Sequence, residues 1–216
     1  MPVAFPPVTS PTMIVADSDS ALVLKHKVQH RGERLTISVP ATAVYLGGQR
    51  FVLYGNADAE IHVFAEADEH RLIKRLFWVQ FERYLPTYPE RRYNYADNER
   101  VNLWGGTVWA GAGPRQSHVA GRPGSDRDHV MAIIAKAGYS VPEEMMSARL
   151  VRLLDDPKSS GTGRRELMLI YSEDLAPTGR HYADLVSDGR TTPAWEPLEQ
   201  PLIARAAAAF EVSALP

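Results

Sequence analysis

The feature that most constrains this chain is the alternation of apolar and polar residues through its first hundred positions. The segment ALVLKHKVQH, residues 21–30, alternates in this way, and RLTISV, residues 34–39, repeats the pattern. Successive side chains of a β-strand point to opposite faces, so each segment offers one face to a core. Between them, HRGE has the polar, glycine-containing composition of a tight connection. We therefore predict that the two segments form a β-hairpin.

Several more segments of the first half have strand character. RFVLYG, residues 50–55, follows a Gly-Gly pair, and EIHVFAEA, residues 60–67, alternates again. RLFWVQFERYL, residues 75–85, carries apolar side chains on both faces, which is typical of a strand in the middle of a sheet. A shorter strand pair is predicted at residues 101–104 and 107–110, around a second Gly-Gly pair.

The second half of the chain opens with signals of a helix. Ser125 is a good N-cap residue, and Asp126 and Asp128 fall in the first turn, where acidic groups interact favourably with the helix dipole. Apolar residues then recur at helical spacing. Gly138 is the expected residue just after the last turn. These signals predict a helix between Ser125 and Gly138.

The remaining part of the chain mixes helix and strand signals. Ser140 begins a capping-box pattern, which predicts a short second helix ending at Met146. ARLVRLL (residues 148–154) and ELMLIYS (residues 166–172) are predicted strands, joined by a polar, glycine-rich loop. The Ala-rich segment 201–212 predicts a final helix.

The order of these elements indicates an α+β fold, because strands come first, helices come later, and no β-α-β alternation occurs. We expect a mainly antiparallel β-sheet built from the N-terminal half plus a hairpin of the C-terminal half, with three or four helices in the second half. The chain has 216 residues, a length that fits a single domain over residues 1–216. Four prolines in MPVAFPPVTSPT predict an extended N-terminal arm over residues 1–20.

Composition excludes several classes of protein and site. With 24 basic and 26 acidic residues, the chain has a formal net charge of -2 and lacks the basic excess of a duplex-binding protein. It contains no cysteine, which excludes thiol nucleophiles, disulfides and zinc-thiolate sites. No apolar run approaches the roughly 20 residues that span a bilayer. We therefore expect neither a nucleic-acid partner nor a membrane.

Two blocks of the chain resemble an uncharacterised family of bacterial proteins. They are RLFWVQFERYLP, residues 75–86, and RRELMLIYSEDLAPTG, residues 164–179, with GSDRDHV between them. The resemblance extends from residue 70 to the C-terminus and implies a bacterial α+β unit, but it brings no activity, cofactor or catalytic residue. Members of the family resemble exported proteins, in which case Met1 replaces a removed signal peptide and the location is periplasmic. As written, without a signal peptide, the sequence predicts a cytoplasmic protein.

The acidic pair Glu173 and Asp174, at the end of a predicted strand, is the first candidate for catalysis. Neighbouring residues of a strand point to opposite faces, so the two carboxylates converge on one substrate atom only if the strand has already ended. Asp174 also suits an Asx-turn, because its side chain can accept the backbone N–H two residues later. We therefore expect a structural role first. In a cleft, Glu173 with a raised pKa could act as an acid or a base.

Histidines and glycines give no metal or cofactor motif. His26 and His30 share a predicted strand face, but four residues of strand separate them by about 13 Å, too far to bind one metal ion. The chain has no HxH, HExxH or GxSxG motif, and no Walker or dinucleotide-binding fingerprint. We expect no metal site and no cofactor.

A long connection rich in glycine and proline is predicted from Ala110 to Asp128. It carries Arg115, His118 and Arg122, and it leads into a helix N-terminus. Long connections in compact domains are commonly functional lids, and arginine near a helix N-terminus can bind an anion. The alternative is a surface loop without a ligand.

The segment FERYLPTYPERRYNY, residues 81–95, interleaves tyrosines with arginines. Tyr and Arg are enriched in interfaces and ligand clefts, since both offer a large flat area with a polar tip. Its candidate ligand-binding residues are Tyr84, Arg91, Arg92 and Tyr93. The alternative is a solvated loop whose tyrosines close over the core.

Three functions from different classes remain open. The first is binding of a small, anionic molecule in a cleft formed by the Tyr/Arg segment and the Gly-rich connection. The second is a small-molecule enzyme that uses Glu173 or Asp174 with His118 for acid-base chemistry. The third is an assembly or interaction subunit, in which the Tyr-rich segment forms a contact within a homo-oligomer. No motif identifies a reaction type.

Overall fold

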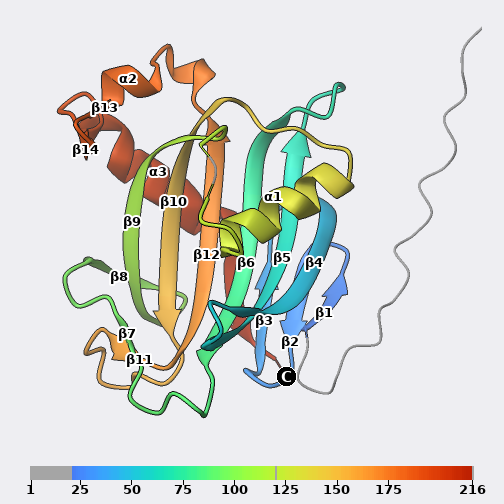
Figure 1. Cartoon of the computed structure of the whole chain (residues 1–216), viewed down its shortest axis with the longest axis vertical. Helices are drawn as coiled ribbons and strands as arrows, with labels where there is room; N and C mark the ends of the chain where they lie inside the picture. The colour runs from blue at the N-terminus through green and yellow to red at the C-terminus, as the bar shows by residue number, and fades with distance from the viewer. Residues whose placement is uncertain (1–20, 120, 216) are drawn as a thin grey trace, which may run out of the picture.

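The computed structural model describes residues 21–119 and 121–215, and its largest element is a seven-stranded antiparallel sheet (Figure 1). In spatial order the strands are β4 (Val44–Leu53), β5 (Ala57–Ala67), β6 (Ile73–Tyr84), β12 (Arg165–Asp174), β10 (Glu144–Leu153), β9 (Gly106–Gln116) and β8 (Glu99–Leu103). The C-terminal-half hairpin β10–β12 is thus inserted between β6 and β9, which precede it in the chain. The α+β class and the antiparallel sheet predicted from the sequence are confirmed.

A second sheet and two longer helices cover the faces of the large sheet (Figure 1). The second sheet has the spatial order β1 (Ala21–Leu24), β2 (Lys27–His30), β3 (Leu35–Ser38) and β15 (Glu211–Ala214). It shares one face with helix α3 (Glu196–Ala209), whereas helix α1 (Asp126–Lys136) covers the opposite face. The short elements are β7 (Tyr93–Asn94) paired with β11 (Thr162–Gly163), β13 (Val186–Ser187) paired with β14 (Arg190–Thr191), α2 (Tyr182–Leu185) and a 3-10 turn at Ala176–Thr178.

Strand β6 shows how the two faces of the large sheet are filled. Phe77, Val79 and Phe81 belong to the core on the side of α3 and the four-stranded sheet. Leu76 and Trp78 belong to the core on the α1 side. A strand with apolar side chains on both faces gains burial from both layers. The prediction that residues 75–85 form a central strand is confirmed.

Helix α1 begins and ends where the sequence signals predicted. The Ser125 hydroxyl accepts a hydrogen bond from the backbone N–H of Asp128 at 3.2 Å. Gly138 follows the helix with a φ of 77°, a left-handed conformation that glycine adopts without a steric penalty. Val130 and Ile134 are buried against the sheet, so their burial holds α1 over β4 and β5.

The first predicted hairpin is confirmed between β2 and β3, but residues 21–30 are not one strand. They fold as two strands, β1 and β2, in which Leu24 pairs with Lys27 across a two-residue turn. Lys25 in this turn has a φ of 54°. A two-residue turn switches the parity of the core-facing residues, so Val23 and Val28 face the core, whereas Leu24, paired with Lys27, is 47% exposed.

Two predictions for the middle of the chain are wrong. The Gly-rich segment continues as strand β9 to Gln116, so the connection to α1 is shorter than expected. The predicted helix from Ser140 to Met146 does not form, because strand β10 begins at Glu144. Met145 and Met146 are buried on opposite faces of the sheet. Burial between β9 and β12 therefore outweighs the local capping pattern.

The last helix also differs from the predicted range of 201–212. Helix α3 starts earlier, at Glu196, and ends at Ala209. The chain then adds strand β15 to the four-stranded sheet, where Val212 pairs with Ile37. The gain from completing this sheet explains why the helix stops before the apolar pattern does.

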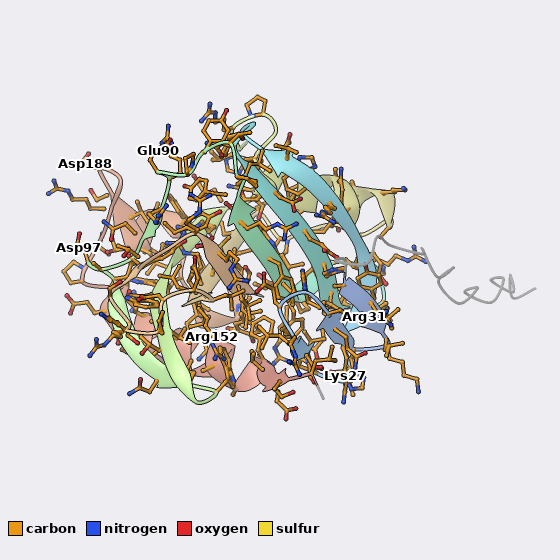
Figure 2. The ribbon with its side chains drawn as sticks, turned by 90° about the horizontal axis from the view of Figure 1, so that it is seen from below. Lys27, Arg31, Glu90, Asp97, Arg152 and Asp188 are labelled. Atoms are coloured by element: carbon orange, nitrogen blue, oxygen red, sulfur yellow. The ribbon has the colours of Figure 1, made fainter. Side chains whose placement is uncertain are left out.

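Exposed charges surround the described part of the molecule. Seen from below, Lys27 and Arg31 lie by the four-stranded sheet, whereas Glu90 and Asp97 lie on the opposite side (Figure 2). No helix among the described residues is long and apolar enough to cross a bilayer. The N-terminal arm predicted for residues 1–20 lies outside the described residues.

Candidate functional site

The acidic pair at the end of β12 is engaged in local contacts. Glu173 accepts hydrogen bonds from the Tyr171 hydroxyl at 2.6 Å and from the Arg205 guanidinium at 2.7 and 3.0 Å. Asp174 accepts the backbone N–H two residues later at 3.1 Å, and Lys74 lies 3.2 Å from its other oxygen. The Asx-turn predicted at Asp174 is confirmed. The two side chains thus have separate partners.

The residues predicted in the Gly-rich connection lie in three different settings. Arg115 is on β9, within the sheet. His118 is exposed just beyond the end of that strand. Arg122 lies over the ring of Tyr54, at 4.6 Å from the ring centre. No hydrogen bond or ion pair within the described residues joins His118 to the acidic pair.

The tyrosines and arginines of segment 81–95 separate in the structure. Tyr84 stacks on Tyr93 with ring centroids 4.4 Å apart, and the Tyr93 hydroxyl donates to Glu82 at 2.7 Å. Arg92 donates to backbone carbonyls of its own loop, and Arg91 is exposed. Tyr84 and Tyr93 therefore pack together, while Arg91 and Arg92 lie at the surface.

A buried carboxyl pair lies on the α1 side of the sheet. Glu82 on β6 and Glu166 on β12 are direct cross-strand partners, with exposed fractions of only 8% and 2%. Glu82 accepts hydrogen bonds from Tyr93 and from the Gln80 amide, each at 2.7 Å. Glu166 is hydrogen-bonded to Tyr95, but its Oε2 atom has no partner among the described residues. An unpartnered buried oxygen is costly and is uncommon in folded proteins.

Burial sets the protonation of this carboxyl pair. It raises the pKa of Glu166 to about 8, and the charge of Glu82 acts in the same direction. The hydrogen bond from Tyr95 and the charge of Arg149 oppose this shift without cancelling it. Burial also raises the pKa of Glu82, against the hydrogen bonds that its two donors supply. Near neutral pH, Glu166 therefore holds a proton.

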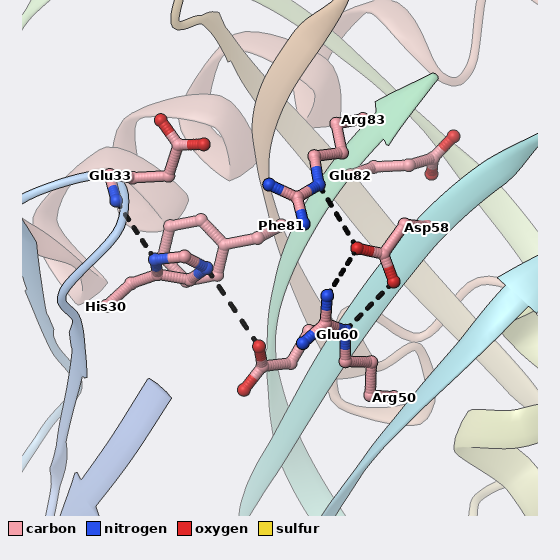
Figure 3. A pocket seen from close by; sticks show the side chains of 8 residues that line it. All are labelled: His30, Glu33, Arg50, Asp58, Glu60, Phe81, Glu82 and Arg83. Carbon is pink, nitrogen blue, oxygen red and sulfur yellow. Dashed lines mark hydrogen bonds and ion pairs between the residues drawn. The ribbon is translucent and has the colours of Figure 1, made fainter. Parts of the chain in front are cut away.

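A second buried polar cluster lies between the two sheets, and Figure 3 shows two of its members, Glu60 and His30. Glu60 on β5 accepts a hydrogen bond from His62 Nε2 at 3.0 Å and one from the backbone N–H of Ala21 at 2.8 Å. The Tyr45 hydroxyl lies 3.3 Å from the other ring nitrogen of His62. His30, from the four-stranded sheet, has its Nε2 atom 3.9 Å from Glu60. This cluster, the inter-sheet cluster, joins side chains of both sheets.

Electrostatics fix the charge states in the inter-sheet cluster. Burial lowers the pKa of His30, although Glu60 opposes this shift. Burial alone would raise the pKa of Glu60, but the hydrogen bonds from His62 and Ala21 bring it below its ordinary value. Burial and the charge of Glu60 raise the pKa of Tyr45 to about 12. Near neutral pH the carboxyl group is therefore ionised, the His30 ring is neutral, and the tyrosine keeps its proton.

The cavity beside the inter-sheet cluster is too small for an organic ligand. It is lined by His30, Glu33, Arg50, Asp58, Glu60, Phe81, Glu82 and Arg83 (Figure 3). Its space of about 20 Å³ holds about one water molecule. His30 Nδ1 already accepts the backbone N–H of Glu33 at 3.1 Å. Asp58 is paired with Arg50 at 2.7 Å and with Arg83 at 3.1 Å. These contacts favour a structural role.

A larger hollow opens beside the ends of β4 and β5. It has a volume of about 460 Å³, within the range of roughly 300–1,000 Å³ typical of small-molecule sites. Its lining consists of Thr42, Val44, Ala65, Glu66, Ala67, Asp68, Arg71, Arg75 and Tyr139. These residues come from the start of β4 and the residues before it, the end of β5, the β5–β6 connection, the start of β6, and the residue that follows Gly138. We call this site the β4–β5 hollow.

The described residues contain no group of three His, Asp or Glu side chains that could hold a metal ion. His26 lies in the turn between β1 and β2, and His30 lies at the end of β2. Comparisons of the chain with protein-family models, with curated proteins and with solved structures gave no match. Any functional assignment therefore rests on the geometry and electrostatics of the sites themselves.

Proposed function

We propose that this protein binds a small organic acid in the β4–β5 hollow. The observation that carries the proposal is the guanidinium of Arg71, which lies 5.6 Å from the centre of the Tyr139 ring and makes no ion pair with a described residue. A guanidinium held over an aromatic ring keeps its N–H donors available for a carboxylate. The volume of the hollow, about 460 Å³, admits such a ligand.

The acidic side chains of the hollow already have partners. Glu66 accepts hydrogen bonds from Arg75 at 2.9 Å and from the Thr42 hydroxyl. Asp68 accepts the backbone N–H of Leu72 at 3.0 Å, and this bond is the main reason that the pKa of Asp68 lies below its ordinary value. Paired carboxylates repel an incoming anion less than free ones do, so the charge of Arg71 dominates the site.

Apolar side chains define the second part of the ligand. Val44 is 53% exposed at the rim of the hollow, and Ala67 is exposed beside it. Covering a half-exposed valine contributes about 1 kcal/mol. An acid with a short aliphatic or aromatic body therefore fits the site better than a bare inorganic anion.

Thermal-shift measurements and isothermal titration with a panel of carboxylic acids test this proposal. We expect a saturable rise in Tm for acids that carry an apolar body. Arg71→Met should weaken binding about tenfold or more, because it removes charge-assisted hydrogen bonds while keeping most of the side-chain volume. The affinity of Arg71→Lys should lie between those of the unmodified protein and Arg71→Met, since lysine keeps the charge but lacks the planar guanidinium that can donate two parallel hydrogen bonds.

The matched control is Arg180→Met. Arg180 is exposed like Arg71 and makes no ion pair with a described residue, but it does not line the hollow. If both substitutions weaken binding equally, the effect comes from net charge and the proposal is wrong. A panel without any saturable ligand would also contradict it.

A further inference from the structure

Three arginines gather on the α1 side of the large sheet, at the opposite end of α1 from the β4–β5 hollow. Arg115 lies on β9, Arg149 lies on β10, and Arg127 lies in the first turn of α1. Strands β9 and β10 are neighbours, and Arg149 is the cross-strand partner of Gly111. Positions two apart in a strand share a face, so Arg115 and Arg149 project from the same side of the sheet.

Glycines on β9 leave room for these side chains. A Cβ atom at Gly113 would lie 3.1 Å from Nη1 of Arg115, so the Arg115 guanidinium folds back over this glycine. The next glycine on the same face, Gly111, lies opposite Arg149. The Arg115 guanidinium therefore extends along β9 toward Gly111, the cross-strand partner of Arg149.

None of the three arginines makes an ion pair with a described residue. Arg127 donates to the backbone carbonyl of Gln116 at 2.9 Å, and Arg149 lies 5.5 Å from the centre of the Tyr95 ring. Burial lowers the pKa of Arg115, and the charges of Arg149 and Arg127 act in the same direction. Because a guanidinium stays protonated in proteins, these charges repel one another.

Several other arginines of the described chain are paired with acids. Arg50, Arg165 and Arg205 each lie 2.7 to 2.9 Å from a carboxylate oxygen. Pairing with an internal carboxylate is the ordinary way to compensate a partly buried guanidinium. Arg115 and Arg149 are exposed and Arg127 is half-buried, so their unpaired guanidinium groups are open to an external anion.

We propose that Arg115, Arg127 and Arg149 form a binding site for the phosphate or sulfate group of a small molecule. Guanidinium donors match the geometry of an oxyanion. Ser147 adds a hydroxyl on the same face, where it is the cross-strand partner of Gly113 and shares a 2.7 Å hydrogen bond with a second serine. The net charge of -2 favours a small ligand over nucleic acid, which requires an extended basic surface.

Isothermal titration of the full chain with inorganic phosphate and with sulfate, at constant ionic strength, tests this site. We expect saturable binding of at least one of the two anions, which also shows which oxyanion the site prefers. Arg115→Met and Arg149→Met should each weaken it about tenfold or more. Gly113→Ala should also weaken binding, although it changes no charge, because its added methyl group displaces the Arg115 guanidinium.

The two proposed sites provide each other's controls. Arg71→Met should leave phosphate and sulfate binding unchanged, and Arg149→Met should leave the binding of organic acids in the β4–β5 hollow unchanged. The oxyanion site is disproved if the unmodified protein shows no saturable binding of either anion, or if Arg71→Met weakens binding as much as Arg149→Met. A short single-stranded DNA that displaces phosphate at lower concentration than a phosphate monoester would overturn the assignment to a small ligand.

Discussion

The two buried polar clusters, one on each face of the large sheet, differ in how completely their groups are hydrogen-bonded. On the side of the four-stranded sheet, Glu60 accepts two hydrogen bonds, and His62 has a partner at each ring nitrogen. On the α1 side, Glu166 leaves one buried oxygen without a partner. A fully bonded network specifies one arrangement of the elements, whereas an unsatisfied group lowers stability. The inter-sheet cluster therefore stabilises the packing of the two sheets, whereas the carboxyl pair lowers the free energy of unfolding.

The two clusters also respond to pH with opposite signs. The folded-state pKa of Glu60 lies below its ordinary value, so its contribution to stability is lost as the pH falls through that pKa. The folded-state pKa of Glu166 is about 8, above its ordinary value of 4.5. In that window the folded chain binds a proton that the unfolded chain has released, so stability falls as the pH rises from 4.5 to about 8.

Substitution of Glu60 should have the largest effect. Glu60→Ala leaves His62 Nε2 and the backbone N–H of Ala21 without an acceptor in a buried site. We expect the free energy of unfolding to fall by about 3 kcal/mol. Urea unfolding at pH 7 measures this change. A loss below about 1 kcal/mol would contradict the view that this cluster joins the sheets, because such a loss is typical of surface contacts.

Substitution of Glu166 should stabilise the protein at alkaline pH. Glu166→Gln removes the titration, so the variant should exceed the unmodified protein by about 2 kcal/mol at pH 8.5 and by little at pH 5. This value is smaller than the full linkage of a shift to about 8, because relaxation and water penetration reduce the penalty of a buried charge. Urea unfolding at both pH values measures the difference.

Glu82→Gln is the matched control for this experiment. Both oxygens of Glu82 accept hydrogen bonds, one from Tyr93 and one from Gln80. In glutamine an NH2 group replaces one of these oxygens, so it would face a donor of Tyr93 or Gln80 instead of accepting from it. We expect Glu82→Gln to destabilise the protein at both pH values. If Glu166→Gln and Glu82→Gln change the stability in the same direction at both pH values, the proposed difference between the fully hydrogen-bonded Glu82 and the partly unpartnered Glu166 is wrong.

Local sequence patterns were sufficient to predict most of the sheet. The apolar side chains on both faces of residues 75–85 predicted a central strand, because the face on which each residue lies is a local property of a strand. The turn at Lys25 escaped prediction, because Lys25 and His26 include none of the Gly, Pro, Asn or Asp residues that signal a turn. The start of β10 at Glu144 escaped for another reason: its strand state depends on two neighbouring strands that lie elsewhere in the chain.

The candidate sites depended on information that no local pattern contains. Glu82 shares the face of Trp78 and Gln80 on a central strand, which signals a buried acid, but its partner Glu166 is identified only by the register of β6 and β12. The β4–β5 hollow combines segments that the sequence separates widely. Among the predicted binding residues, Arg115 lies in the oxyanion site that we propose here.

The smallest change in stability is expected from substitution of His30. Its pH dependence is opposite in sign to that of Glu166, because the contribution of His30 is lost as the pH falls. Burial lowers the folded-state pKa of His30, so below its ordinary value of 6.5 the unfolded chain binds a proton that the folded chain does not. His30→Asn keeps an acceptor for the backbone N–H of Glu33 and removes the titration. At pH 7 the variant should therefore differ from the unmodified protein by less than about 1 kcal/mol. As the pH falls from 7 to 5, the unmodified protein should lose more stability than the variant, which unfolding at these two pH values measures. An equal loss in both proteins would mean that His30 titrates alike in the folded and unfolded chains, and acid sensitivity would then have to come from Glu60.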